Sequence, residues 1–74
     1  MIIYIVILED NPPFREFETQ DKEQAIKKCR SKGIPHFYEL DSNDRVNPKR
    51  VWHVTKDSVT SKTWAETVAE HDRH

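Results

Sequence analysis

The sequence has little cysteine and little glycine: Cys29 and Gly33 are the only residues of their kinds in 74. A single thiol cannot form an intrachain disulfide, and small secreted domains usually depend on two or more. We therefore expect a reducing, cytoplasmic location. The chain also lacks a phosphate-binding loop, a dinucleotide fingerprint, a nucleophile elbow and zinc-finger spacing. These absences predict a protein that is not an enzyme and has no cofactor or metal.

An excess of charge of either sign is also missing. Twelve Lys and Arg face thirteen Asp and Glu, for a formal net charge of −1. This balance disfavours strong steering toward nucleic acid phosphates and does not resemble an acidic nucleic acid mimic. No repeat or linker marks an internal boundary, so we expect one domain over residues 1–74. Chains this short bury little surface, and a partner or a second copy in a homodimer would complete the core.

Long hydrophobic runs are absent as well. The run "MIIYIVIL" is too short to span a bilayer, has no basic region before it and is followed by Glu9 and Asp10. We interpret residues 2–8 as a strand and expect no membrane partner. The strand is apolar on both faces, with Ile3, Ile5 and Ile7 on one and Tyr4, Val6 and Leu8 on the other. Such a strand needs a cover on each side.

The next segments predict a turn, a strand and a helix. "EDNPP" ends the first strand, and "FREFET" predicts a second strand over residues 14–19. Asp21 with Gln24 predicts the start of a helix over residues 22–32, and Gly33 followed by Pro35 predicts its end. Helical spacing places Ala25, Ile26 and Cys29 on one apolar stripe. We expect this helix to cover the sheet, with its basic residues mostly in solvent.

The second half predicts further strands over residues 36–40 and 50–55, joined by a polar loop. The tail has two interpretations: a C-terminal helix near 63–71, or an extension of strand by the Thr and Val residues before Ala65. We favour the helix. The expected fold is α+β: a small four-stranded, mostly antiparallel sheet in the order ββαββ, with one helix packed on it and a short C-terminal helix. The crossover through the helix would allow one parallel strand pair.

Several side chains could carry chemistry, and each also has a structural interpretation. Cys29 could be a nucleophile with His36 or His53 as its base, but its place on the apolar stripe predicts a core residue. His36 and His53 could meet across the sheet, more plausibly as half-buried polar residues than as a metal site. The terminal pair His71 and His74 could hold a divalent ion loosely, although a frayed tail is the simpler interpretation. The carboxylates around the first hairpin are expected to be exposed edge and turn residues: Glu9, Asp10, Glu16 and Glu18.

Weak nucleic acid binding is the alternative function. Phe37, Tyr38 and Trp52 on the sheet, beside Lys49, Arg50 and Lys56, could stack bases and contact phosphates.

The layout resembles that of small phage-encoded inhibitors, namely anti-CRISPR proteins and inhibitors of host RNA polymerase. The points of similarity are the segments "IIYIVIL", "FREFET", "DKEQAIKKCRSKG", "HFYEL" and "RVWHVT". The resemblance covers most of the chain but contains no diagnostic motif, and it implies a stoichiometric inhibitor that blocks a surface of a host protein complex. Since Arg and aromatic side chains dominate such interfaces, we expect the partner contacts at Arg45, Lys49, Arg50 and Trp52, and next at Lys27, Lys28 and Arg30.

Overall fold

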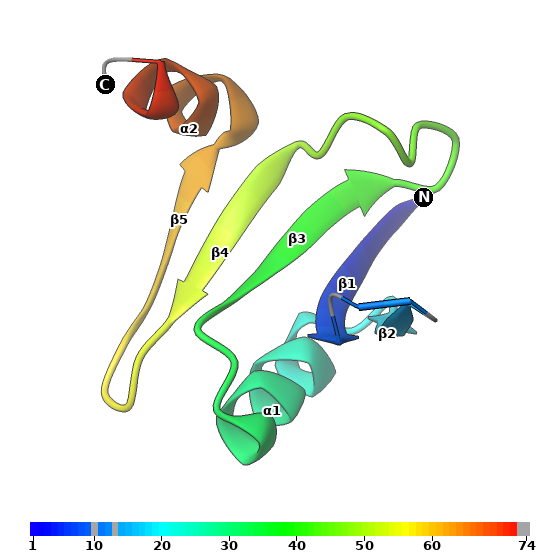
Figure 1. Ribbon diagram of the computed structural model, residues 1–74, viewed down its shortest axis with the longest axis vertical. Helices are drawn as coiled ribbons and strands as arrows, with labels where there is room; N and C mark the ends of the chain where they lie inside the picture. Colours follow the sequence, from blue (N-terminus) through cyan, green and yellow to red (C-terminus); the bar gives the residue numbers. More distant parts are fainter. Residues whose placement is uncertain (10, 13, 73–74) are drawn as a thin grey trace.

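The computed structural model describes residues 1–9, 11–12 and 14–72. These residues form a five-stranded sheet and two helices (Figure 1). In chain order the elements are β1 (Ile2–Glu9), β2 (Arg15–Thr19), α1 (Lys22–Lys32), β3 (His36–Asp41), β4 (Arg50–Val54), β5 (Val59–Thr63) and α2 (Trp64–His71). The α+β class and the four predicted strands are confirmed, whereas the prediction of only four strands is wrong. Neither helix is long and apolar enough to cross a membrane, as far as the described residues go.

The strands lie in the order β2-β1-β3-β4-β5, and each neighbouring pair is antiparallel. The expected parallel pair is therefore wrong for the described sheet. The crossover through α1 does connect two strands that run in the same direction, β2 and β3, but β1 lies between them and pairs with both. This position makes β1 a central strand, as its apolar faces predicted.

Local caps fix α1 at its predicted bounds. The Asp21 side chain accepts a hydrogen bond from the backbone N–H of Glu23 at 3.0 Å. At the other end Gly33 adopts the left-handed conformation, with φ of 68°, and the backbone N–H groups of Gly33 and Ile34 both donate to the carbonyl of Cys29. These bonds satisfy the end of the helix before Pro35.

The main core lies between α1 and one face of the sheet. Ala25, Ile26 and Cys29 are buried, as the stripe predicted, and they pack with Val6 and Phe37, which are also fully enclosed. Tyr4, Leu8 and Phe17 border this cluster. The predicted covering role of α1 is therefore confirmed.

The opposite face of β1 is closed within the same chain. Ile3, Ile5 and Leu40 form a second buried cluster there. Glu18 lies opposite Ile5 on β2, and Arg45 from the loop after β3 forms an ion pair with Glu18, so this pair passes over β1. Because the cluster is buried in one chain, the apolar faces of β1 do not by themselves require a second copy. A homodimer stays a prediction.

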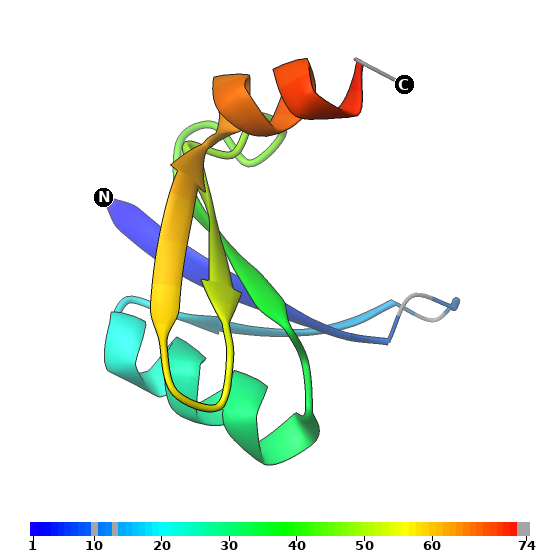
Figure 2. The ribbon, with the colours of Figure 1, turned by 90° about the vertical axis from the view of Figure 1, so that its left-hand side faces the viewer.

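The tail combines both predicted alternatives, since β5 leads directly into α2. Bonds between Thr55 and Ser58 close the turn before β5, which pairs with β4 at the edge of the sheet. Its sequence "VTSKT" is too polar to predict a strand, and an edge strand needs only one pairing partner. Thr63 then caps α2 as predicted, accepting a hydrogen bond from the backbone N–H of Glu66 at 3.1 Å. Figure 2 shows α2 and α1 at opposite ends of the molecule.

Candidate functional site: an aromatic platform and a histidine groove

A half-buried tryptophan occupies the part of the sheet that α1 leaves open. Within the described residues α1 packs on β1, β2, β3 and part of β4, but it does not contact β5. Trp52 lies on β4 on this side of the sheet. Its indole stacks on the buried Phe37 ring, with 6.0 Å between centroids and 7° between planes. The tryptophan is thus supported from below by the core and accessible from outside.

Two charged residues hold the indole in one orientation. The Trp52 Nε1–H donates to a carboxylate oxygen of Glu39 at 2.9 Å, and the Lys22 ammonium lies 4.7 Å from the ring centroid. Glu39 is the cross-strand partner of Arg50, whose Nε–H donates to the Ser61 hydroxyl at 3.1 Å. We call the group Lys22, Glu39, Arg50, Trp52 and Ser61 the Trp52 platform.

The predicted partner residues do not form one surface. Arg50 and Trp52 share the platform, and Lys49 is exposed just before β4. Arg45 instead pairs with Glu18 over the opposite face, so its guanidinium is already engaged in holding the loop.

The predicted basic residues of α1 are also divided. Lys27 is exposed, and the Lys28 ammonium lies 4.7 Å from the centroid of the Phe17 ring. Arg30 donates to the carbonyl of Thr55 at 3.5 Å. Two of the three therefore support packing against neighbouring elements.

The surface expected for nucleic acid is not assembled. Phe37 is fully buried, and Tyr38 lies on the opposite face of β3 from Trp52. The prediction that Phe37, Tyr38 and Trp52 are displayed together is therefore wrong. Only one of these three rings is available on the platform side of the sheet for stacking.

Sequence reasoning missed Lys22, Glu39 and Ser61 as neighbours of the tryptophan. Glu39 and Ser61 reach it through the register of β3 and β5 with β4. Lys22 arrives through the first turn of α1. The alternation of β4 did predict that Trp52 lies on the opposite face from Val51 and His53, but no local pattern specifies which strands lie beside it.

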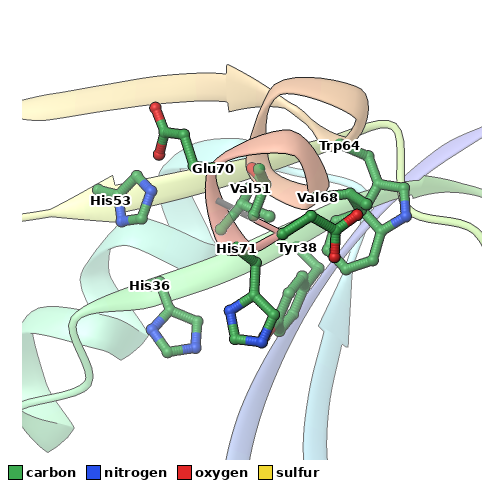
Figure 3. A pocket seen from close by; sticks show the side chains of 10 residues that line it. His36, Tyr38, Val51, His53, Trp64, Val68, Glu70 and His71 are labelled. Atoms are coloured by element: carbon green, nitrogen blue, oxygen red, sulfur yellow. The ribbon is translucent and has the colours of Figure 1, made fainter. Parts of the chain in front are cut away.

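The second candidate is a groove of about 590 Å³ between α2 and the sheet face opposite α1 (Figure 3). Trp64, Val68 and His71 of α2 line one wall. The floor comes from β3 and β4 and includes Val51 and three polar side chains: His36, Tyr38 and His53. Among the residues of α2 none is fully buried, and Val68 remains 39% exposed.

His36 and His53 do meet across the sheet, because they are direct partners in the β3–β4 pair. The Val54 N–H donates to the carbonyl of Pro35 at 2.8 Å, which makes the two histidines a non-hydrogen-bonded pair. Side chains are closest at such positions, with Cα atoms about 4.5 Å apart. The His36 ring also contacts Tyr38 edge to face, at 5.5 Å between centroids.

Other residues with chemical potential are engaged or lie apart. The Cys29 thiol is fully buried, it donates to the His36 carbonyl at 3.6 Å, and burial raises its pKa to about 11. The predicted core role is confirmed. Glu9 pairs with Arg15, while Asp10 and His74 lie outside the described residues, so the expectations for them are not addressed. Across the described part of the chain, no three His, Cys, Asp or Glu side chains form a ready-made metal cluster.

Comparison with known proteins finds no matching family model, no matching curated protein and no matching solved structure.

Proposed function

We propose that the chain is a non-enzymatic protein-binding module whose contact surface is the Trp52 platform. It would act as a stoichiometric inhibitor of a partner complex, the mode of action that the layout of small phage inhibitors implies. The observation that carries this proposal is a half-buried tryptophan, fixed by Phe37, Glu39 and Lys22, on a part of the sheet that no helix covers.

Preorganisation supports the choice of this surface. Interface hot spots are enriched in Trp and Arg, and binding costs less when side chains are already ordered. Trp52 and Arg50 lie two residues apart on β4, and each has a hydrogen bond within the chain that fixes its orientation. Little side-chain entropy would be lost when a partner docks.

The chemistry of the platform favours an apolar partner surface with carboxylates around it. The indole supplies apolar area, while Lys22 and Arg50 supply positive charge and Glu39 is already bonded to the indole. A nucleic acid strand is the less suitable partner, since Phe37 and Tyr38 do not join Trp52 as stacking surfaces.

The test compares the native chain with a charge-reversed platform, Lys22→Glu combined with Arg50→Glu. Tagged protein captures partners from nuclease-treated lysate, and the affinity for the recovered complex is then measured. We expect binding to weaken at least about tenfold, equivalent to ~1.4 kcal/mol, since both cations flank the proposed contact.

The matched control is Lys27→Glu combined with Lys32→Glu, which makes the same charge change at exposed positions of α1. Circular dichroism checks that both variants fold. Equal binding by all three proteins would exclude the platform, and loss only in the control would move the contact to α1. Recovery that disappears with nuclease would favour nucleic acid binding instead.

A further inference from the structure

The cross-strand histidine pair has the arrangement of a bidentate metal chelate. Imidazole suits zinc, copper and nickel among the divalent first-row metals. Two nitrogens bound to one zinc ion at about 2.1 Å in tetrahedral geometry lie about 3.4 Å from each other. Side chains at a non-hydrogen-bonded antiparallel position start from Cβ atoms about 5 Å apart, so two imidazoles can close that distance by rotation of their side-chain torsions.

Both side chains are accessible where they would be needed. His53 is exposed and His36 is half-buried, and both line the groove below α2 (Figure 3). No hydrogen bond or ion pair is found for either imidazole among the described residues, and the Tyr38 ring contacts His36 only through its edge. Metal binding would therefore not have to break an existing bond of either ring.

We propose that His36 and His53 chelate a divalent transition-metal ion of the zinc class on the floor of the groove. The two imidazoles occupy half of a tetrahedral shell. The remaining positions face the groove, where water or a donor atom from an incoming molecule completes the coordination. This site lies on the opposite face of the sheet from the Trp52 platform, so it is independent of the proposed protein contact.

The affinity is that of a two-ligand site, because the described residues hold no preformed cluster of three donors. His71 also lines the groove, and the sequence offers a competing explanation for any zinc binding: the terminal pair His71 and His74. The experiment must separate these two pairs.

Zinc ion alone is titrated into chelator-treated, full-length protein, with calorimetry for affinity and nuclear magnetic resonance of the histidine rings for assignment. We expect one zinc per chain and shifted ring signals of His36 and His53. His53→Gln and His36→Gln should each weaken binding by about tenfold or more, since losing a ligand costs at least as much as losing an outer-shell partner.

The control is the double variant His71→Gln with His74→Gln, which should retain the native affinity. Amide spectra of the metal-free proteins show whether each variant keeps the fold, and His53→Gln is the safer substitution because its side chain is exposed. Absence of saturable binding, or binding that the tail variant abolishes, would overturn the proposal.

Discussion

At the scale of single residues, burial decides what Cys29 can do. Its sulfur is enclosed between α1 and the sheet, and removal from water raises the thiol pKa to about 11 from an ordinary value of 9.0. The thiolate is the nucleophilic form, so a buried thiol with this pKa is a packing residue. The second hollow in the surface, beside Gly33 and Thr55, borders Cys29 without exposing it.

The raised pKa predicts alkaline destabilisation. Between pH 9 and 11 the unfolded chain releases the Cys29 proton while the folded chain keeps it, so the free energy of unfolding falls by about 2 kcal/mol across this range. Cys29→Ala lacks this contribution. Urea unfolding of both proteins from pH 8 to 11 should therefore show their stability difference changing by that amount, with the native chain losing more. The titration of Tyr4 and other groups cancels in the comparison, and a constant difference would contradict the prediction.

At the scale of elements, the sequence predicted what short-range chemistry determines. Helix α1 has its predicted bounds because Asp21 and Gly33 act within one turn of its ends. Strand β5 could not be predicted, because β4 orders it by pairing along the edge of the sheet and its own residues bury little. The same limit applies to the Trp52 platform, since Glu39 and Lys22 reach the indole only through tertiary structure.

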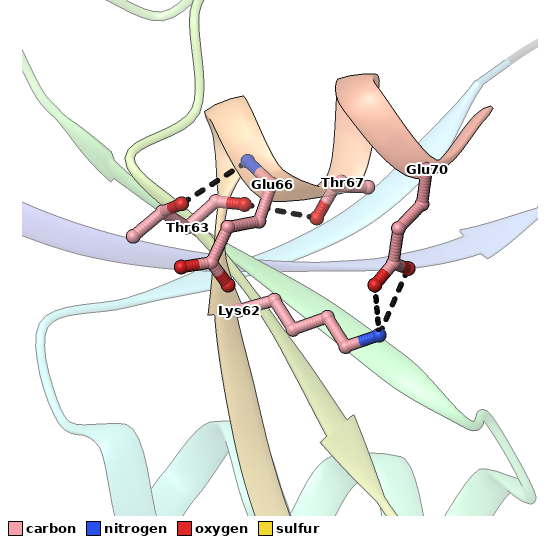
Figure 4. A network of polar contacts seen from close by, with 5 residues as sticks. All are labelled: Lys62, Thr63, Glu66, Thr67 and Glu70. Carbon is pink, nitrogen blue, oxygen red and sulfur yellow. Dashed lines mark hydrogen bonds and ion pairs between the residues drawn. The ribbon is translucent and has the colours of Figure 1, made fainter. Parts of the chain in front are cut away.

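Helix α2 is the element that depends most on local bonds (Figure 4). The Thr63 hydroxyl caps its first turn, and Lys62 Nζ reaches the two Glu70 carboxylate oxygens at 2.7 and 2.8 Å. With no fully buried residue, this helix gains little from packing. Its stability should therefore respond to capping more than that of α1.

We expect Thr63→Ala to destabilise α2 by about 1 kcal/mol, the usual value of a threonine cap. Amide hydrogen exchange should accelerate about fivefold in α2 and little in the sheet, since local opening is separate from global unfolding. Thr60→Ala, at an exposed position of β5, is the control. An equal loss of protection in β1 and β3 would show that α2 unfolds only together with the whole chain.

At the scale of the whole molecule, two covers are built from very different material. Helix α1 and the sheet enclose the main cluster, whereas the opposite face is closed by Ile3, Ile5 and Leu40 with the Arg45–Glu18 pair above them. Neither cluster includes a residue of α2. The fold therefore places the Trp52 platform on one side and the histidine groove on the other, so variants at the two sites should act independently.

This division predicts that a chain ending after Thr63 still folds. Removing the residues from Trp64 onward takes away one wall of the groove and the hydrogen bond from the Trp64 N–H to the Lys49 carbonyl, and it exposes Val51, which is only 4% exposed in the full chain. Partial loss of that burial should lower the free energy of unfolding by about 1 to 3 kcal/mol. Urea unfolding followed by circular dichroism should remain a single cooperative transition.

Methyl resonances of Val6 and Ile26 provide the sharper criterion, because both side chains lie in the cluster under α1 and far from the deleted helix. Their chemical shifts should match those of the full chain, whereas those of Val51 should move. A truncated chain that is unfolded, or in which the Val6 and Ile26 signals collapse, would mean that α2 stabilises the core through the sheet. In that case the groove would belong to the folding unit, and the metal chelate proposed there would depend on the helix above it.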